Sequence, residues 1–235
     1  MIPQDPSPDP DEPADGEDGA QRSFFGDAPA PQPARAKSRT KAIPAAEHPD
    51  ALRQLGAAMP AQLHLGTSSW AFAGWNGIVY GAKASESLLS REGLPAYSSH
   101  PLLNSVSLDR TFYAPLTAEQ YAHYANQVPS GFRFVVKAPN LVTDAVLRDD
   151  RGAPSGPNPS FLDPVLATDH FVTPCLEGLG TKAGPLVFQF SPLPSEILGD
   201  PSGWVARLSA FLAALPPLPA SQGHERPFYA VEFRD

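Results

Sequence analysis

Five short apolar runs that alternate with helical segments constrain the fold of residues 61–235 more than any other feature. The runs are QLHLGTSSW (62–70), LLNSVSLDRTF (102–112), GFRFVVKAPN (131–140), GPLVFQFSP (184–192) and FYAVEFRD (228–235). Helical spacing of apolar residues occurs between them, over 85–101, 117–127, 161–180 and 203–217. Strands that alternate with helices in this way are typical of parallel βαβ units. The sequence therefore predicts an α/β fold.

The helical segments differ in the strength of the sequence signals that predict them. Thr117 and Gln120 are three residues apart, which predicts a capping box at the start of 117–127. The segment 161–180 contains Pro174, and we expect an interruption there. The clearest helix is 203–217, whose apolar stripe consists of Trp204, Val205, Leu208, Phe211, Leu212 and Leu215.

The first sixty residues have a different composition. Residues 1–50 contain ten prolines, and ten acidic residues against five basic ones. Such a segment cannot bury enough apolar surface to offset the entropy lost on ordering. We therefore predict a disordered, proline-rich and acidic tail and linker over 1–60, and a folded domain over 61–235. We interpret the basic run at 35–41 as a solvated linker, with contact to an acidic partner or nucleic acid as the alternative.

Charge and cysteine content argue against several classes of protein. The net charge of -8 disfavours a general nucleic-acid or membrane binder, although the folded region alone carries only about -3. The N-terminus lacks the basic and apolar regions of a signal peptide, and no stretch approaches the length of a membrane span. The single cysteine, Cys175, cannot form an internal disulfide. We therefore expect a soluble, cytoplasmic protein.

Two architectures fit the alternation of elements, a doubly wound sheet and a (β/α) barrel. The glycine-rich phosphate-binding motifs that would support a nucleotide-binding open sheet follow none of the strands. Polar residues gather instead where the strands end: Thr67, Ser68, Trp70, Asp109, Thr111, Lys137, Gln189, Glu232 and Arg234. In a barrel these ends converge on one mouth, where catalytic groups lie.

The phrases LGTSSWAFAGWNGIVY, SVSLDRTFYAPL, FRFVVKAP, GPLVFQFSP and YAVEFRD occur in this order. Together they resemble the YecE-like family, also called domain of unknown function 72, over about residues 62–235. The resemblance implies a TIM-type barrel with a site at its mouth, but it implies no reaction. Many relatives carry Glu-x-Asn where this chain has Asp109-Arg110-Thr111, so the carboxylate here is one methylene shorter.

The implied barrel is incomplete in this chain. Five strands are predicted, whereas a TIM-type barrel has eight βα units. We therefore expect either that the natural chain continues past Asp235 or that the sequence is a gene fragment. In both cases the site at the mouth is a partial one.

Four charged residues at the strand ends form the predicted catalytic group: Asp109, Lys137, Glu232 and Arg234. Two carboxylates can divide acid and base work when their surroundings separate their pKa values, and the two basic residues suit an anionic substrate group. Substrate-binding roles are predicted for Trp70, Thr67, Ser68 and Gln189, with the tryptophan as a stacking wall. As an alternative, Glu232 and Arg234 pair with each other or with Lys137.

The sequence predicts no metal site and no cofactor, because the six histidines are scattered and none is at ligand spacing. Cys175 is interpreted as a small core residue and not as a nucleophile. The leading hypothesis is a metal-independent acid/base enzyme, a hydrolase or lyase, that acts on a polar, anionic or phosphate-bearing small molecule. The alternatives are a protein that processes or binds nucleic acid and a non-catalytic ligand-binding module.

Overall fold

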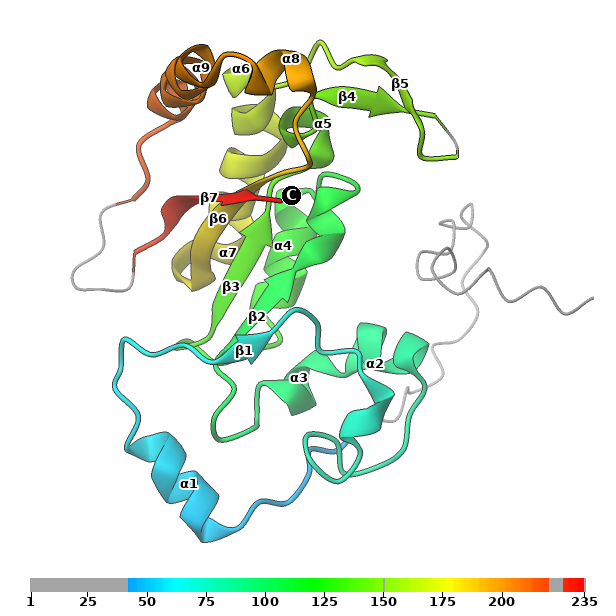
Figure 1. Ribbon diagram of the computed structural model, residues 1–235. Coiled ribbons are helices and arrows are strands. Elements are labelled where there is room, and N and C mark those ends of the chain that lie inside the picture. Colours follow the sequence, from blue (N-terminus) through cyan, green and yellow to red (C-terminus); the bar gives the residue numbers. More distant parts are fainter. Residues whose placement is uncertain (1–41, 150, 220–225, 235) are drawn as a thin grey trace, which may run out of the picture. The chain divides into compact units, whose positions relative to one another are not determined.

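The structure, a computed structural model, describes residues 42–149, 151–219 and 226–234. Its central element is a five-stranded sheet in which all neighbouring strands are parallel. In their order across the sheet the strands are β1 (Gly66–Thr67), β2 (Ser105–Leu108), β3 (Arg133–Lys137), β6 (Ala183–Phe190) and β7 (Phe228–Phe233). Each lies in one of the five predicted runs, so the parallel α/β fold is confirmed (Figure 1).

The order of the strands across the sheet follows their order in the chain. A doubly wound sheet has a point at which this order reverses, and the described part of the sheet has none. Within the described residues β1 and β7 form the two ends of the sheet and are not paired with each other. Closure into a barrel therefore stays a prediction.

Strand β1 is much shorter than its predicted run because a side chain replaces its first ladder bonds. The Asn104 side chain accepts from Leu65 N at 2.8 Å and donates to Leu63 O at 3.1 Å. Gly66 then pairs with Ser105 at so short a distance that a Cβ atom at position 66 would lie 2.1 Å from the Ser105 carbonyl oxygen. Only glycine fits at the start of this strand.

The helices of the described residues are α1 (Asp50–Ala57), α2 (Glu86–Glu92), α3 (Leu94–Tyr97), α4 (Ala118–Ala125), α5 (Asn140–Thr143), α6 (Pro164–Ala167), α7 (Thr173–Leu179), α8 (Ser195–Leu198) and α9 (Pro201–Ala214). The capping box at the start of α4 is confirmed, since Thr117 and Gln120 each accept from the other's backbone N–H. Pro174 lies in the first turn of α7, and the π-helical turn Thr168–Val172 precedes it. The expected interruption is thus a widened turn, which relieves the clash that proline makes with the preceding turn.

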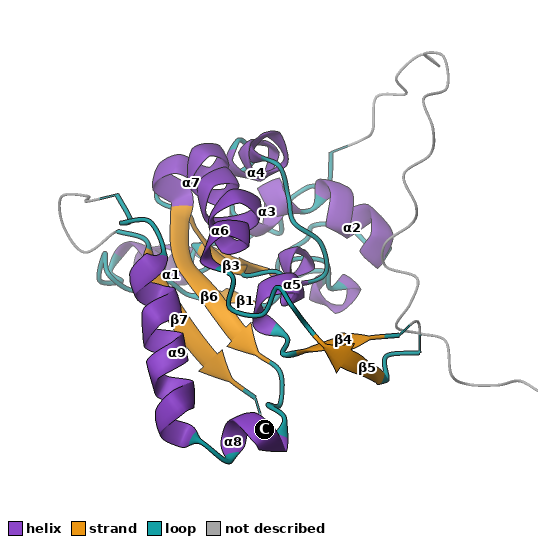
Figure 2. Ribbon diagram, turned by 90° about the horizontal axis from the view of Figure 1, so that it is seen from above, coloured by secondary structure: helices purple, strands orange, loops and turns teal. Residues whose placement is uncertain are grey.

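Helices α7 and α9 flank one face of the sheet (Figure 2), and aromatic side chains of α9 and of the π-helical turn before α7 pack against this face. The ring centroid of Phe188 lies 5.7 Å from that of Phe171 and 5.2 Å from that of Phe211. Two residues further along β6, Phe190 lies 5.4 Å from Trp204. Successive side chains of a strand alternate between faces, so these aromatic residues fix which face of β6 packs on the helices.

Side chains of the opposite parity face away from these helices. The register aligns Ser107 with Val135, Lys137 with Val187, and Gln189 with Glu232. A single face of the sheet therefore carries, near the carboxyl ends of its strands, Ser107, Lys137, Gln189 and Glu232. This face is less covered than the other, since Ser107, Val135 and Lys137 are only partly buried.

Two features differ from the prediction. The antiparallel hairpin β4 (Val146–Arg148) and β5 (Pro154–Pro157) was not predicted, because its strands are short and its second strand consists of proline, serine and glycine. Val205 was predicted in the buried stripe of α9, but it is 60% exposed. The buried positions Trp204, Phe211 and Leu215 are separated by seven and four residues, and Val205 lies at the margin of that stripe.

Residues 42–60, predicted as part of the tail, contain ordered structure. Ala46 N donates to Val79 O at 3.0 Å, Gly81 N donates to Pro44 O at 2.8 Å, and helix α1 follows. By its contacts this segment groups with residues 61–235, so the folded domain begins earlier than the predicted boundary. Composition gives little signal for this segment, because backbone hydrogen bonds and only a few apolar contacts, such as those of Ile43 and Ala46, hold it. The predicted disorder and the basic run at 35–41 fall on residues 1–41, outside the described residues.

No helix of the described residues is long and apolar enough to cross a lipid bilayer.

We expect Phe188→Ala to lower the free energy of unfolding by about 3–5 kcal/mol, because it removes a ring that packs between two helices. Val205→Ala, the matched control on the exposed margin of α9, should change it by no more than about 0.5 kcal/mol. Urea unfolding followed by circular dichroism measures both. Equal losses in the two variants would contradict the orientation of β6 and α9 described above.

Candidate functional site

Lys137 lies at the centre of a polar cluster at the carboxyl end of β3. Its Nζ atom donates to Gln189 Oε1 of β6 at 2.6 Å and lies 3.7 Å from Asp109 Oδ1, which follows β2. These three side chains come from neighbouring strands and meet because parallel strands place their carboxyl ends at one edge of the sheet. The structure thus brings together three of the residues that the sequence predicts.

Asp109 is held in place by its own strand and turn. It begins the 3₁₀ turn Asp109–Phe112, and Ser107 Oγ donates a short hydrogen bond to Asp109 Oδ1. Thr111 Oγ1 lies 2.6 Å from both Leu108 O and Lys137 O, so its hydroxyl links the ends of β2 and β3. The Thr111 side chain is fully buried, whereas the Asp109 side chain stays 39% exposed.

Arg110 does not join the cluster. Its guanidinium donates to the hydroxyl of Tyr124 in α4 at 2.8 Å, on the side of the sheet that the helices cover. The polar run Asp109-Arg110-Thr111 therefore divides into three roles: a carboxylate at the cluster, a contact to a helix, and a link between strands.

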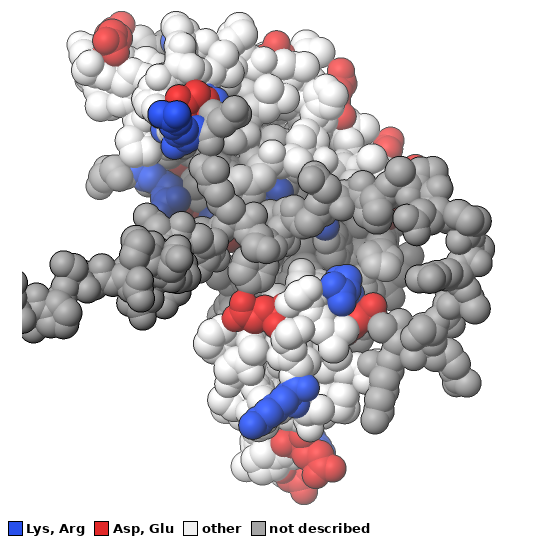
Figure 3. Space-filling model, turned by 90° about the vertical axis from the view of Figure 1, so that its right-hand side faces the viewer, with Lys and Arg blue, Asp and Glu red and all other residues white. Residues whose placement is uncertain are grey.

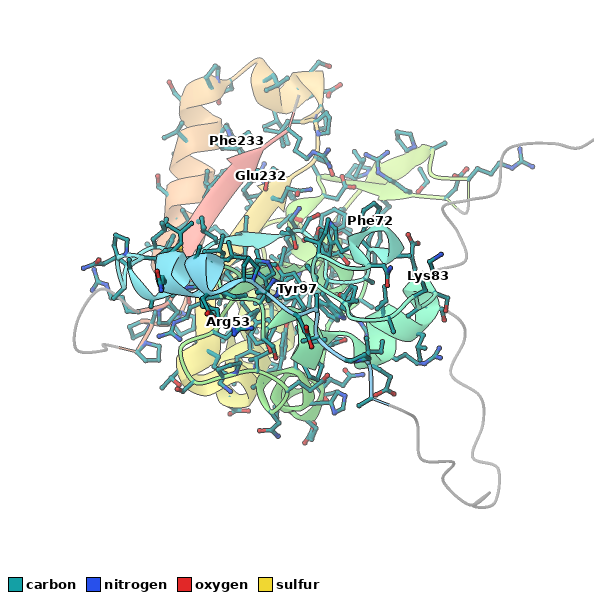
Figure 4. The ribbon with its side chains drawn as sticks, turned by 90° about the horizontal axis from the view of Figure 1, so that it is seen from below. Arg53, Phe72, Lys83, Tyr97, Glu232 and Phe233 are labelled. Carbon is teal, nitrogen blue, oxygen red and sulfur yellow. The ribbon has the colours of Figure 1, made fainter. Side chains whose placement is uncertain are left out.

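Glu232 and Arg234 lie further along the same edge. Glu232 is aligned with Gln189 and is exposed at the carboxyl end of β7, where Figure 4 labels it. Arg234 N donates to Phe190 O at 3.2 Å. Neither side chain forms an ion pair with a described residue, so the alternative in which they pair with each other or with Lys137 is not observed.

The predicted pair of carboxylates is not a close pair. Asp109 follows β2 and Glu232 lies on β7, with β3 and β6 between them. At a strand spacing of about 4.8 Å this separates the two carboxylates by roughly 14 Å. Pairs that cleave glycosidic bonds together lie only about 5–10 Å apart. The carboxylate and ammonium of Asp109 and Lys137 are therefore the closer partners.

The charge of this edge is balanced, because Asp109 lies beside Lys137 and the strand ends carry two acidic and two basic residues. Where described residues are visible in Figure 3, their acidic and basic side chains form small separate groups. Lys137 and Arg234 are thus two local cations at this edge and do not form one positive surface.

Trp70, predicted as a stacking wall, packs into the core. It is 8% exposed, its indole N–H donates to Leu89 O at 3.1 Å, and its ring lies 5.6 Å from that of Tyr124. The sequence could not separate this position from the strand end, because β1 stops at Thr67 and the chain turns toward α2.

Thr67 and Ser68 also lie outside the cluster. The Thr67 N–H donates to the hydroxyl of Tyr97 at 3.1 Å, and Tyr97 in turn donates to Ser105 O at 2.9 Å. Burial raises the pKa of Tyr97, which keeps this hydroxyl protonated as a donor. Thr67 therefore joins β1 to α3. Ser68 is exposed, with no hydrogen bond to a described residue.

Two site residues were missed as participants by sequence reasoning. Ser107 orients the Asp109 carboxylate, and Thr111, noted only as polar, connects the strand ends. The spacing of Ser107 and Asp109, two residues apart at the end of one strand, was a usable signal, because such residues share a face.

Among the described residues no group of three or more His, Cys, Asp or Glu side chains is placed to hold a metal ion. Cys175 is completely buried in α7, in the core. Burial raises the pKa of its thiol to about 12, so that only a minute fraction is thiolate near neutral pH.

The fold and this cluster define an α/β protein with an acidic and a basic side chain in contact at the carboxyl edge of a parallel sheet. A family model described as "Protein of unknown function DUF72" matches residues 64–235, so the chain belongs to the DUF72 family. This confirms the YecE-like resemblance of the sequence. No curated protein matches the chain.

Solved structures of the same family are similar to the chain. A DUF72 family protein of Enterococcus faecalis V583 is 19% identical, with 73% of this chain and 50% of that chain covered and a TM-score of 0.41. A DUF72 family protein of Thermotoga maritima MSB8 is also 19% identical, with 73% and 56% covered and a TM-score of 0.40. The matched part spans about half the length of these relatives.

We expect Cys175 to be unreactive toward Ellman's reagent at pH 8 in the folded protein, because its thiol is buried and protonated. In guanidinium chloride one thiol per chain should react, which serves as the control. Rapid labelling of the folded chain would contradict the placement of α7 in the core.

Proposed function

We propose that this protein is an acid/base enzyme, a hydrolase or lyase, which acts on a polar or anionic small molecule at the carboxyl ends of β2, β3 and β6. The observation that carries the proposal is that Lys137 Nζ contacts both Gln189 Oε1, at 2.6 Å, and Asp109 Oδ1, at 3.7 Å. Charged groups on an apolar strand are costly to bury, and an ion pair there adds little stability over apolar residues. A catalytic role accounts for their presence.

In this proposal each side chain has a separate task. Asp109 is the general base, which takes a proton from the substrate or from water, and its exposed fraction leaves room for a substrate to approach. Lys137 stabilises the negative charge that develops on a substrate oxygen. Gln189 fixes the Lys137 ammonium, and Ser107 fixes the Asp109 carboxylate. Glu232, further along the edge, contacts a more distant part of the substrate, whereas Arg234 has no assigned task in this reaction.

We also propose that the sheet belongs to a (β/α) barrel. Parallel strands in sequential order support this architecture. Large apolar side chains are exposed at both ends of the described sheet: Leu63 and Leu65 next to β1, and Phe228 and Val231 on β7. Further strands between β7 and β1 would cover them, as barrel closure requires.

A non-catalytic ligand-binding module would use the same contacts without turnover, and a nucleic-acid protein would add phosphate contacts. Turnover therefore separates the three proposals. Nitrophenyl phosphates, glycosides and esters, together with hydroxy acids that can eliminate water, form a suitable screen for the full chain. Binding without turnover supports the module, and retention on single-stranded DNA supports the nucleic-acid protein.

Where the screen detects turnover, we expect Asp109→Asn and Lys137→Met each to reduce kcat about 10²–10⁴-fold, because each removes an acid/base or electrostatic contribution. Asp169→Asn and Lys83→Met, which change exposed residues of the same types, are the controls and should retain activity. Thermal unfolding of all four variants checks that they are folded. Full activity in Asp109→Asn would exclude this residue as the base.

A further inference from the structure

A cavity of about 350 Å³ opens at the carboxyl ends of β6 and β7. Its lining includes Ser191 and Leu193 from the loop after β6, Leu198 from α8, Trp204 from α9, and Phe233 and Arg234 from the end of β7. This volume lies in the lower part of the range of small-molecule sites. The cavity uses none of the residues assigned to proton transfer above.

Aromatic rings form one wall of the cavity, and the core fixes them from behind. Phe233 stacks on Phe190 with ring centroids 5.7 Å apart and contacts Trp204 edge to face at 6.2 Å. Phe233 and Leu198 nevertheless remain 56% and 58% exposed. Apolar surface that is rigid, concave and exposed is typical of a ligand site, because a bound ring would remove it from water.

Arg234 gives the cavity a positive charge. It is the one charged side chain among the described residues that line the cavity. Its backbone N–H is anchored to Phe190 O, whereas its guanidinium has no hydrogen bond or ion pair to any described residue. A guanidinium donates two parallel hydrogen bonds to a carboxylate or phosphate, so it suits an anion at the cavity rim.

A second hollow, which Trp204 also lines, has the opposite charge character. It is lined by Glu196, Asp200 and Arg207 among others, so two carboxylates lie there against one guanidinium. The Arg207 guanidinium already lies over the Phe161 ring, 5.7 Å from its centroid. An anion is therefore attracted to the cavity that contains Arg234 and repelled from the hollow that contains Glu196 and Asp200.

We propose that this cavity binds a small amphiphilic anion, in which a planar aromatic body packs against Phe233 and Trp204 and a carboxylate or phosphate pairs with Arg234. The site is separate from the Asp109 and Lys137 contact and does not depend on its proposed chemistry. Its ligand is an effector or a second substrate of the protein.

Titration of the full chain with phenyl phosphate and with benzoate, followed by calorimetry and by tryptophan fluorescence, tests the proposal. Saturable binding of either probe supports it, and the stronger one identifies phosphate or carboxylate as the preferred group. Benzyl alcohol, which lacks the charge, and inorganic phosphate, which lacks the ring, should each bind at least about tenfold more weakly. Equal binding of either control, or no saturation by about 10 mM of both probes, would overturn the proposal.

Binding measurements on substituted chains test whether the probes bind in this cavity. Arg234→Gln and Leu198→Asp change exposed residues, so the chain should still fold, and each should weaken binding at least about tenfold. Arg226→Gln, at the other end of β7, is the matched control and should bind normally. Asp109→Asn should also bind normally, which keeps this result distinct from the test of the enzyme. Unchanged binding in Arg234→Gln, or loss in Asp109→Asn, would refute a separate site at Arg234.

Discussion

The alternation of side chains along β6 is the constraint on which the rest of the structure depends. Phe188 and Phe190 pack against rings from α9 and from the π-helical turn that precedes α7, and a strand has only two faces. Once these aromatic residues face the helices, Val187 and Gln189 must face the other way. A shift of one residue would bury Gln189 among aromatic rings, so the packing of the core sets the position of the polar cluster.

Lys137 shows how the sheet tolerates a charge in its central part. Its neighbours β2 and β6 each contribute one oxygen ligand, from Asp109 and Gln189. Without them the ammonium would lose solvation that the sheet does not replace. The same two contacts hold the side chain in one orientation, which is a requirement of a catalytic group and of a structural ion pair alike.

Sequence reasoning predicted the strands, the helix cap and the side-chain contact that follow from periodic patterns. The five strands, the capping box of Thr117 and Gln120, and the meeting of Lys137 with Gln189 all follow from repeats of two or of 3.6 residues and from the alignment of parallel strand ends. Trp70 was misassigned because its side chain lies beyond the end of a two-residue strand, where periodicity gives no direction. The segment 42–60 and the hairpin of β4 and β5 depend largely on backbone hydrogen bonds, for which composition carries no signal.

The hydroxyl of Thr111 has a mechanical consequence for the cluster. Because it lies within 2.6 Å of a carbonyl oxygen of β2 and of one of β3, the turn that carries Asp109 is attached to the backbone of Lys137 itself. The backbone that carries the Asp109 carboxylate is therefore held beside β3 independently of the ion pair, while the contacts with Asp109 and Gln189 orient the Lys137 ammonium. Salt that screens the ion pair would weaken the attraction between Asp109 and Lys137. The turn that carries Asp109 would stay attached to the end of β3, because the hydrogen bonds of Thr111 are buried.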